Sequence, residues 1–451
     1  MPFTSIPWLE LAVAVGLLGT LVVGRLRDPL TAANVCLAFV STLLTLCIAA
    51  WVAFAVDPTA SPQGVLTHLL GRPVLMLDEL NAPLVPGIAL LHWLTVLATA
   101  RTKMVRFSFS RLLLGAAIRV ATFACLAPVD LALLLLIGVL PPYLELRARK
   151  RPTGVYLLHM GLFIALLLGG LATSGTVSAV LLMAAVLLRS GTFPLHVWVT
   201  DLFENGSFGT ALLTVAPITG MYAALRLVLP IPTPDWILQS IGAASLCTAL
   251  YAAGMALVQT EARRFFAFLV LSHAALVLVG MELHTTISLT GALALWPSLA
   301  LSLVGFGLTL RALEARFDRL ALTEYRGLYS SCPPLAVGFL LTGLACVGFP
   351  GTSGFLASEL LIDGALTVNP IVGITVVIVA ALNGVAVLRV YLLLFTGKPS
   401  TSRVSLHITP REQTAFLILS ALILLGGLLP QFAISNRHQA AEMTLAQRAT
   451  Q

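Results

Sequence analysis

The residues of this chain that are best suited to chemistry stand together in one apolar stretch. The stretch reads RSGTFPLHVWVTDLFEN and contains Arg189, Pro194, His196, Asp201 and Glu204. Ionisable groups at bilayer depth are costly and usually functional, so this cluster indicates an ion path. An arginine hardly ever gives up its proton, so Arg189 indicates a fixed charge.

A second stretch repeats the pattern. The sequence VGFP ends at Pro350 as GTFP ends at Pro194, and two further acids, Glu359 and Asp363, follow Pro350. Proline removes a backbone donor and breaks a helix, and the freed carbonyls are tolerated in a bilayer only beside protein or water. The repeat therefore predicts two helices broken near Pro194 and Pro350. Two unrelated proline kinks are the alternative.

Membrane-spanning helices must position these residues. Of 451 residues, 58% are hydrophobic and 10% are charged, which leaves too few polar groups to cover a soluble globule. The basic residues, which give a net charge of +7, lie in short clusters between apolar stretches, as membrane-facing loops require, and this argues against nucleic acid as a partner. No CxxC, GxGxxG or P-loop pattern occurs, so we expect no metal, redox or nucleotide cofactor and no catalytic residue.

Apolar stretches of about 20 residues, the length that a bilayer requires, predict an all-α polytopic membrane protein with about fourteen spans. They fall near residues 8–24, 34–56, 82–100, 112–127, 129–146, 153–172, 175–192, 209–229, 236–258, 265–282, 287–310, 334–367, 371–396 and 412–432. Basic clusters follow odd-numbered spans, at 25–27, 101–111, 147–151, 263–264, 311–326 and 398–411. By the positive-inside rule these loops are cytoplasmic, so both termini are expected on the outer side of the cell (inner) membrane.

Spans 4–8 and 9–13 form two five-helix sets that begin from opposite sides of the membrane. Such an inverted repeat, with a broken helix in each half, is typical of membrane ion sites. The prediction is one membrane domain, residues 1–451, in four parts. They are helices 1–3 in 1–105, the first repeat in 106–232, the second repeat in 233–397, and the last helix and tail in 398–451.

Several motifs, in order, carry a resemblance to a known family. FPLHVWVTD at 193–201 resembles FPLHxWLPDA, EARRFFA at 261–267 resembles DxKRxLA, and GFPGTSGF at 348–355 resembles GLPGTSGF; LDELN, RVY and GLLPQ are similar to three further signatures. The chain resembles the antiporter-like subunits of complex I, Mrp-type cation/proton antiporters and membrane-bound hydrogenases. The resemblance implies a fourteen-helix fold with helices 7 and 12 broken. In length the chain is most similar to M-type NADH-quinone oxidoreductase subunits.

The departures from that family concern its proton relay. In the family a glutamate on helix 5 pairs with a lysine on helix 7, and a histidine stands on helix 8. The resemblance puts Leu136, Arg189 and Thr214 at these positions, and span 11, residues 287–310, has no ionisable group. The first half is therefore expected not to run the usual relay, although ordered water past Arg189 is an alternative. On helix 12, Glu359 is the nearest candidate, offset by one residue.

Other polar residues have two interpretations each. His273, where the family often has Gln or His, belongs either to a proton path or to an interhelical hydrogen bond. His196 is expected to orient the broken helix rather than to transfer protons. Asp201 and Glu204 either cap the next helix or receive protons at the cytoplasmic mouth. Arg389 is a candidate through the RVY match alone.

Three functions from different classes remain open. The first is an antiporter-like subunit that moves H⁺ or Na⁺ within a quinone-reducing or hydrogenase-type complex. The second is a structural module that kept the fold and lost the relay. The third is the membrane half of an inorganic-carbon uptake system with a carbonic-anhydrase-like partner. Other integral membrane subunits and membrane lipid are the expected partners.

Overall fold

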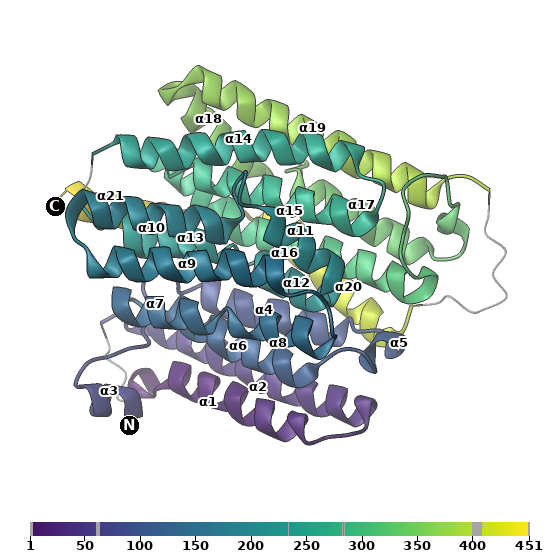
Figure 1. Ribbon diagram of the computed structural model, residues 1–451, viewed down its shortest axis with the longest axis horizontal. Coiled ribbons are helices and arrows are strands. Elements are labelled where there is room, and N and C mark those ends of the chain that lie inside the picture. Colours follow the sequence, from purple (N-terminus) through teal and green to yellow (C-terminus); the bar gives the residue numbers. More distant parts are fainter. Residues whose placement is uncertain are drawn as a thin grey trace. The chain divides into compact units, whose positions relative to one another are not determined.

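The chain is helical throughout the residues that the computed structural model describes, which are 3–59, 64–232, 234–281, 283, 285–398 and 408–449 (Figure 1). Within these ranges β-pairing is limited to two isolated bridges, Leu75 with Cys125 and Glu261 with Ala321. A helix satisfies its backbone hydrogen bonds internally, as a bilayer requires. The predicted all-α fold class is confirmed.

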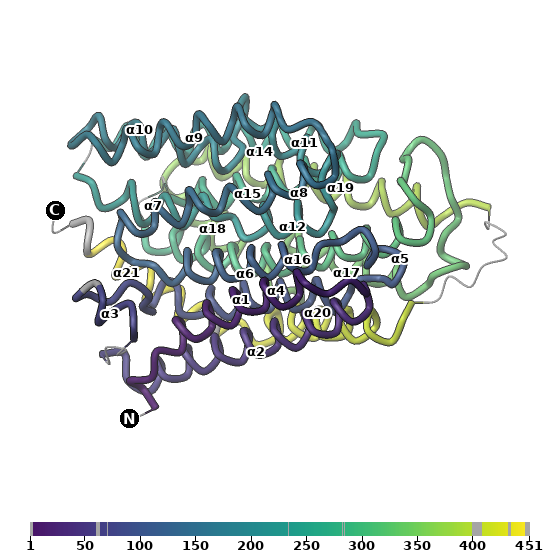
Figure 2. The backbone as a smooth tube through the Cα atoms, turned by 60° about the horizontal axis from the view of Figure 1, so that its bottom comes forward, coloured from purple at the N-terminus to yellow at the C-terminus, as the bar shows by residue number. Residues whose placement is uncertain are grey.

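The chain forms two compact units, residues 1–153 and 154–451. The main helices of the first unit are α1 (Trp8–Gly24), α2 (Pro29–Val56), α4 (Leu84–Leu97), α6 (Phe109–Ala124), α7 (Pro128–Ile137) and α8 (Leu140–Ala148). Its short elements are η1 (Phe3–Ser5), α3 (Val65–Leu70) and α5 (Arg101–Met104). Helices α1 and α2 lie side by side (Figure 2). The four-part division predicted from the sequence stays a prediction.

A local cap fixes the start of α2. The Asp28 carboxylate accepts a hydrogen bond of 2.7 Å from the Thr31 backbone N–H and one of 2.6 Å from the Thr31 hydroxyl. These hydrogen bonds favour the ionised form and lower the pKa of Asp28 below its usual value. The short connection between α1 and α2 therefore carries its own stop and start signals.

The second unit contains the remaining helices. They are α9 (Gly154–Ala172), α10 (Gly175–Ser190), α11 (Val197–Asn205), α12 (Phe208–Val215), α13 (Thr219–Ala223), the π-helix η2 (Ala224–Val228), α14 (Trp236–Val258), α15 (Ala262–Val279), α16 (Thr286–Phe317), η3 (Leu328–Ser330), α17 (Pro333–Cys346), α18 (Phe355–Val368), α19 (Pro370–Phe395), α20 (Pro410–Leu428) and α21 (Gln431–Ala449).

Helix α16 is the centre of the second unit. It is 32 residues long, most of its side chains are buried, and it contacts α12, α15, α17, α18, α20 and α21. Helix α19 instead exposes large apolar side chains such as Ile371, Ile374 and Leu388. Such a surface suits contact with lipid or with another membrane subunit.

The described residues contain nine helical segments long and apolar enough to cross a bilayer, and four shorter apolar helices accompany them. The count of fourteen spans and the inverted repeat stay predictions. Helix α21 falls in the predicted tail. Its sequence is polar, so the apolar runs that predict membrane spans do not include it.

Two helices are interrupted where the sequence predicts it. The first break, residues 191–196, separates α10 from α11 and contains Pro194; the second break, residues 347–354, separates α17 from α18 and contains Pro350. Gly191 and Gly348 begin the turns at φ 72° and 76°, a left-handed conformation that glycine adopts without a steric penalty.

The structure differs from the sequence prediction at the eighth predicted span and at the end of α16. A third break, residues 216–218, separates α12 from α13 inside the predicted eighth span, and Ile218 there has a φ of 50°. Helix α16 continues to Phe317, so residues 311–317 are helical and not part of the predicted basic loop at 311–326. The loop assignment was wrong because the charges of this segment are buried in ion pairs.

Candidate functional site

Arg189 lies at the end of α10 with 8% of its surface exposed. Its guanidinium carbon is 5.3 Å from the centre of the Trp198 ring. The Trp198 Nε1 donates a hydrogen bond of 3.0 Å to the Leu188 carbonyl, which fixes the indole beside the arginine. Among the described residues no carboxylate forms an ion pair with Arg189. This geometry suits a fixed positive charge held on an aromatic face.

Within the part of the chain that the structure describes, buried polar atoms without a protein partner gather around the first break. They are Arg189 Nε, Ser190 Oγ, His196 Nδ1 and Asp201 Oδ2. Buried polar groups are rarely left unpaired, and ordered water usually binds at such atoms. The first break is therefore a place that water can occupy.

His196 is the residue directly before α11, and its ring is packed among aromatic side chains. Ring centres lie 5.9 Å from Phe193, 5.2 Å from Tyr251 and 5.8 Å from Phe268. The side chain makes no capping hydrogen bond to α11. This packing supports the orienting role predicted for His196.

Asp201 and Glu204 lie on α11 and have local partners. Asn205 Nδ2 donates a hydrogen bond of 2.9 Å to Asp201, and an Arg264 nitrogen lies 3.0 Å from the Glu204 carboxylate. The cap of the next helix, α12, is the Ser207 hydroxyl. The capping interpretation of the two acids is therefore wrong, and their place at the cytoplasmic mouth of an ion path stays a prediction.

A cavity of about 470 Å³ opens beside the second break. His273 of α15, Leu295 and Leu299 of α16, and Ser358 and Glu359 of α18 line it, together with the second break and one side of α19. A water molecule occupies about 30 Å³ in the liquid, so this space holds several. The cavity brings two of the predicted ion-path residues, one histidine and one carboxylate, to one volume.

His273 has backbone partners on two helices, the Leu269 carbonyl of its own helix and the Cys346 backbone of α17. Its Nδ1 lies 2.8 Å from the Leu269 carbonyl, which can only accept, so Nδ1 carries a hydrogen in this contact. The contact with Cys346 is interhelical, as one of the two interpretations of His273 predicts, and the neighbouring Ser272 adds two further interhelical hydrogen bonds. The Ser272 hydroxyl donates to the Ala249 carbonyl at 2.9 Å and accepts from Asn383 Nδ2 at 2.9 Å.

The other candidates of the second half lie around this cavity. Glu359 is exposed at the cavity, and Asp363, one turn later on α18, is exposed without lining it. Arg389 Nη1 donates a hydrogen bond of 3.3 Å to the Gln259 carbonyl, which ties α19 to the end of α14. Arg389 therefore holds helices together rather than facing the cavity.

The resemblance implies a lost relay group at two positions, Thr214 on α12 and Leu136 on α7. Thr214 is 2% exposed, and its hydroxyl donates a hydrogen bond of 2.7 Å to the Thr210 carbonyl of its own helix. Leu136 is a half-buried residue of α7 in the first unit. A hydroxyl used by its own helix and a hydrocarbon offer no group that titrates near neutral pH.

The sequence analysis missed two buried acids of the second unit. Arg263 binds Glu314 through two hydrogen bonds of 2.7 Å, and Arg316 binds Glu412, which is fully buried, at 2.8 and 3.0 Å. The partners are 51 and 96 residues apart in sequence, so no local spacing reveals them. Their burial holds the end of α16 against α15 and α20.

Arg263 also holds the end of the broken helix. Its Nη1 donates to the Phe203 carbonyl at 3.0 Å and to the Gly206 carbonyl at 3.2 Å. These are carbonyls at the C-terminal end of α11, where a helix leaves acceptors free and favours a cation. The same guanidinium thus ties α11 to α16 through Glu314.

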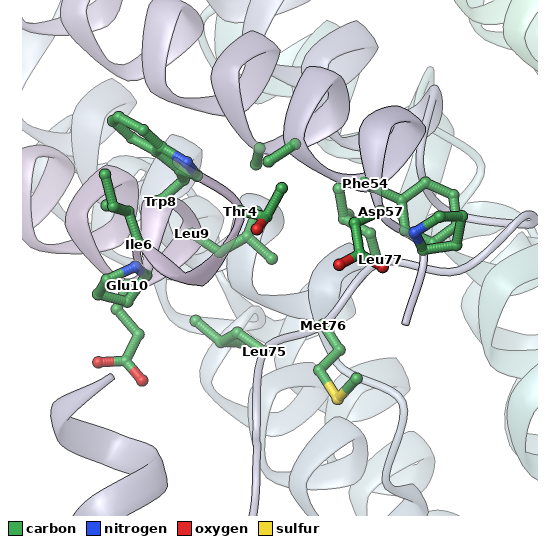
Figure 3. Close-up of a pocket in the computed structure, with 14 residues that line it drawn as sticks. Thr4, Ile6, Trp8, Leu9, Glu10, Phe54, Asp57, Leu75, Met76 and Leu77 are labelled. Atoms are coloured by element: carbon green, nitrogen blue, oxygen red, sulfur yellow. The ribbon is translucent and has the colours of Figure 1, made fainter. Parts of the chain in front are cut away.

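A smaller pocket of about 50 Å³ lies in the first unit, between the start of α1 and the end of α2 (Figure 3). The two acids that line this pocket accept hydrogen bonds from backbone N–H groups. The Glu10 carboxylate accepts from the Leu66 N–H at 3.2 Å, and the Asp57 carboxylate accepts from the Thr59 N–H at 3.1 Å. The predicted ion-path residues lie elsewhere, so this pocket is not part of the candidate path.

Fold and site together define a polytopic, all-helical membrane protein with interrupted helices, one of them beside a largely apolar cavity that His273 and Glu359 also line. Residues 153–383 match the family described as NADH:quinone oxidoreductase/Mrp antiporter, TM. The chain belongs to this family of antiporter-like membrane proteins.

Known relatives and structures agree with this family. The chain is 26% identical over 278 residues to NADH-quinone oxidoreductase subunit N of Rhodococcus opacus, covering 60% of this chain and 51% of the relative. A chain of respiratory complex I from Thermus thermophilus with bound NADH gives a TM-score of 0.84 at 20% identity, covering 97% of this chain and 99% of that one. A chain of the Mrp complex from Dietzia sp. gives 0.82 at 19%, covering 98% and 97%.

The sequence matches cover only part of the relatives. The chain spans about half the length of the curated relatives that it matches, and these relatives include subunits named N and subunits named M. At these identities the solved structures establish the fold alone. The closer likeness to M-type subunits stays a prediction.

Proposed function

We propose that this chain is an ion-translocating, proton-moving membrane subunit of a complex of the NADH-quinone oxidoreductase type. The single observation that carries the proposal is the cavity of about 470 Å³ that brings His273 and Glu359 together beside the second break. A carboxylate and an imidazole can each bind and release a proton, and water in the cavity can join them. The second half then carries the working part of the path.

The first half contributes fixed charge and position in this proposal. Arg189 keeps its proton because a guanidinium remains protonated in proteins. With Leu136 and Thr214 at the other relay positions, no pair of exchanging groups remains there. This supports a degenerate relay in the first half and no catalytic chemistry in the chain itself.

The proposed setting is a bacterial inner membrane, with both termini on the outer side and with other integral membrane subunits as partners. Two similar structures are those of respiratory complex I and of an Mrp complex, which supports such partners. A carbonic-anhydrase-like partner has no comparable support. The clusters of basic residues in alternate loops support the orientation.

Ion flux through the intact complex tests the proposal. The complex is purified through a tag on this chain, its subunits are identified by mass spectrometry of the intact assembly, and it is reconstituted into proteoliposomes. Glu359→Gln should lower proton flux about tenfold or more, because the amide cannot exchange a proton. Asp363→Asn is the matched control, because Asp363 is one turn away and outside the cavity lining.

Two results would contradict the proposed function. Unchanged flux in Glu359→Gln would favour a non-conducting structural subunit. Copurification with a carbonic-anhydrase-like protein in place of redox or Mrp-type subunits would favour inorganic-carbon uptake.

A further inference from the structure

One turn of α16, residues Trp296–Ser298, makes hydrogen bonds in two directions, and we call it the α16 turn. Pro297 lies inside the helix, where it removes a backbone donor and allows a local kink. Trp296 is 1% exposed and Ser298 is 7% exposed. Their polar atoms must therefore find partners inside the protein.

The first direction leads to the third break. Trp296 Nε1 donates a hydrogen bond of 2.9 Å to the Pro217 carbonyl. The next residue, Ile218, has a φ of 50°, which is strained for a β-branched side chain and persists only where neighbours fix the backbone. The indole is one of those neighbours, so the conformation of the third break depends on the α16 turn.

The third break in turn lies against the helix that carries Arg189. Helix α13 follows the third break and packs on α10. A Cβ atom at Gly220 of α13 would lie 1.9 Å from the Ser190 hydroxyl oxygen, so the two helices touch without spare room. Ser190 is the residue next to Arg189. The end of α10 therefore touches α13 at Gly220, three residues after Pro217.

The second direction leads to the second break. The Ser298 hydroxyl lies 2.8 Å from the Ser353 hydroxyl, which belongs to the second break. The Ser353 backbone N–H donates a hydrogen bond of 3.0 Å to the Ile423 carbonyl of α20, which anchors that loop. Leu295 and Leu299, on either side of the α16 turn, line the cavity that contains Glu359.

We propose that Trp296 and Ser298 are positioning residues that couple the Arg189 region to the cavity at the second break. The proposal rests on the proposed function, in which ions move through that cavity. Residues 287–310 of α16 carry no ionisable group, so this coupling transmits hydrogen-bond geometry and not protons. A change of charge beside the first break moves the third break, the indole, and then the serine pair at the second break.

The test uses the whole complex and a matched pair of double variants. Trp296→Phe with Ser298→Ala removes both hydrogen bonds and keeps the ring and the small side chain. The control, Trp93→Phe with Ser302→Ala, likewise removes one indole N–H and one serine hydroxyl. Trp93 Nε1 donates to a serine hydroxyl in the first unit, and Ser302 is a buried residue of α16 whose hydroxyl has no partner among the described residues.

The first measurement is the pH midpoint of proton flux in proteoliposomes. Arg189→Gln should shift this midpoint by about half a pH unit, which is about a threefold change in proton affinity. The shift should remain in the control background and disappear in the Trp296→Phe, Ser298→Ala background. A shift that persists there would show that the charge of Arg189 acts through space, and it would overturn the coupling.

The second measurement needs no transport. Hydrogen exchange of the second-break amides, residues 347–354, should change about threefold or more on Arg189→Gln in the parent and control backgrounds. It should not change when Trp296 and Ser298 are substituted. No response in the parent would overturn the coupling. A response that follows these two residues in a complex without any flux would keep the coupling and reject the proposed function.

Discussion

The first and second breaks share a Phe-Pro motif and differ in what surrounds it. At the first break Arg189 packs on Trp198 and makes no ion pair within the described part of the chain. At the second break a cavity of about 470 Å³ brings His273 and Glu359 together. A helix break at a proline thus lies beside a permanent positive charge in one half. In the other half it lies beside an imidazole and a carboxylate, which are side chains that can bind and release protons. A proline break marks where ions can be accommodated, and the side chains decide whether protons can be exchanged.

The two half-helices that follow the breaks are also held differently. The end of α11 is held by the guanidinium of Arg263, which also binds Glu314 of α16. Helix α18 packs between α16 and α19, with Glu359 and Asp363 on its exposed side. A clamped helix favours a fixed structure around Arg189, whereas an exposed acidic helix beside a cavity leaves room for hydration.

The largest effect is expected from Arg263→Met, which removes the clamp on α11. Glu314, 4% exposed, would lose both hydrogen bonds from Arg263 and keep the nearby charges of Arg311 and Arg319, at a cost of about 3 kcal/mol. Thermal unfolding of the purified complex, or its failure to assemble, measures this loss. Arg264→Met is the control, because its pair with Glu204 is exposed and contributes less than about 1 kcal/mol. Equal losses in both variants would show that α11 is not clamped by Arg263.

A smaller effect is expected from Gly220→Ala, which tests how closely the third break packs on the Arg189 helix. The new methyl group would meet the Ser190 hydroxyl at 1.9 Å, and overpacking of this kind costs about 1–3 kcal/mol. Ser190→Ala in the same chain should restore part of the thermal stability. Gly161→Ala, where no atom lies within 4 Å of the added group, should leave the melting temperature unchanged. Equal melting temperatures for Gly220→Ala and Gly161→Ala would show that the contact between α10 and α13 is loose.

The smallest effect is expected from His273→Gln, which keeps a polar side chain beside the cavity and removes the titrating ring. Proton flux should fall about three- to tenfold while the complex still assembles, because general acid–base groups contribute through proton exchange. His159→Gln is the matched control, since that ring makes the same bond to a carbonyl four residues earlier on α9. A full-rate His273→Gln complex would remove histidine from the path and leave Glu359 alone.

Most of the fold could be predicted from the sequence. Apolar runs of bilayer length fix the helices, and the two Phe-Pro motifs fix the first and second breaks, because proline cannot complete the helical ladder. The third break was missed because the chain there reads as one unbroken apolar run apart from Pro217. The end of α16 was missed because buried charges and loop charges look alike until their partners are known.

The candidate site could be predicted only as separate residues. Arg189, His273 and Glu359 were visible because charged and imidazole side chains are rare in apolar stretches. Their surroundings were not, because the cavity and the pairs Trp296 with Pro217 and Ser298 with Ser353 join segments 79 and 55 residues apart. Such contacts arise from tertiary packing, which no local spacing encodes.

The most direct test of the central claim is to compare proton flux in proteoliposomes that hold the intact complex with Arg189→Lys or with Glu359→Gln. The account predicts that Arg189→Lys assembles and loses no more than a few-fold of the flux, because a fixed positive charge is retained. It predicts a loss of about tenfold or more in Glu359→Gln, because the exchangeable proton is gone. Loss of flux in Arg189→Lys together with full flux in Glu359→Gln would contradict the account and place the working path in the first half.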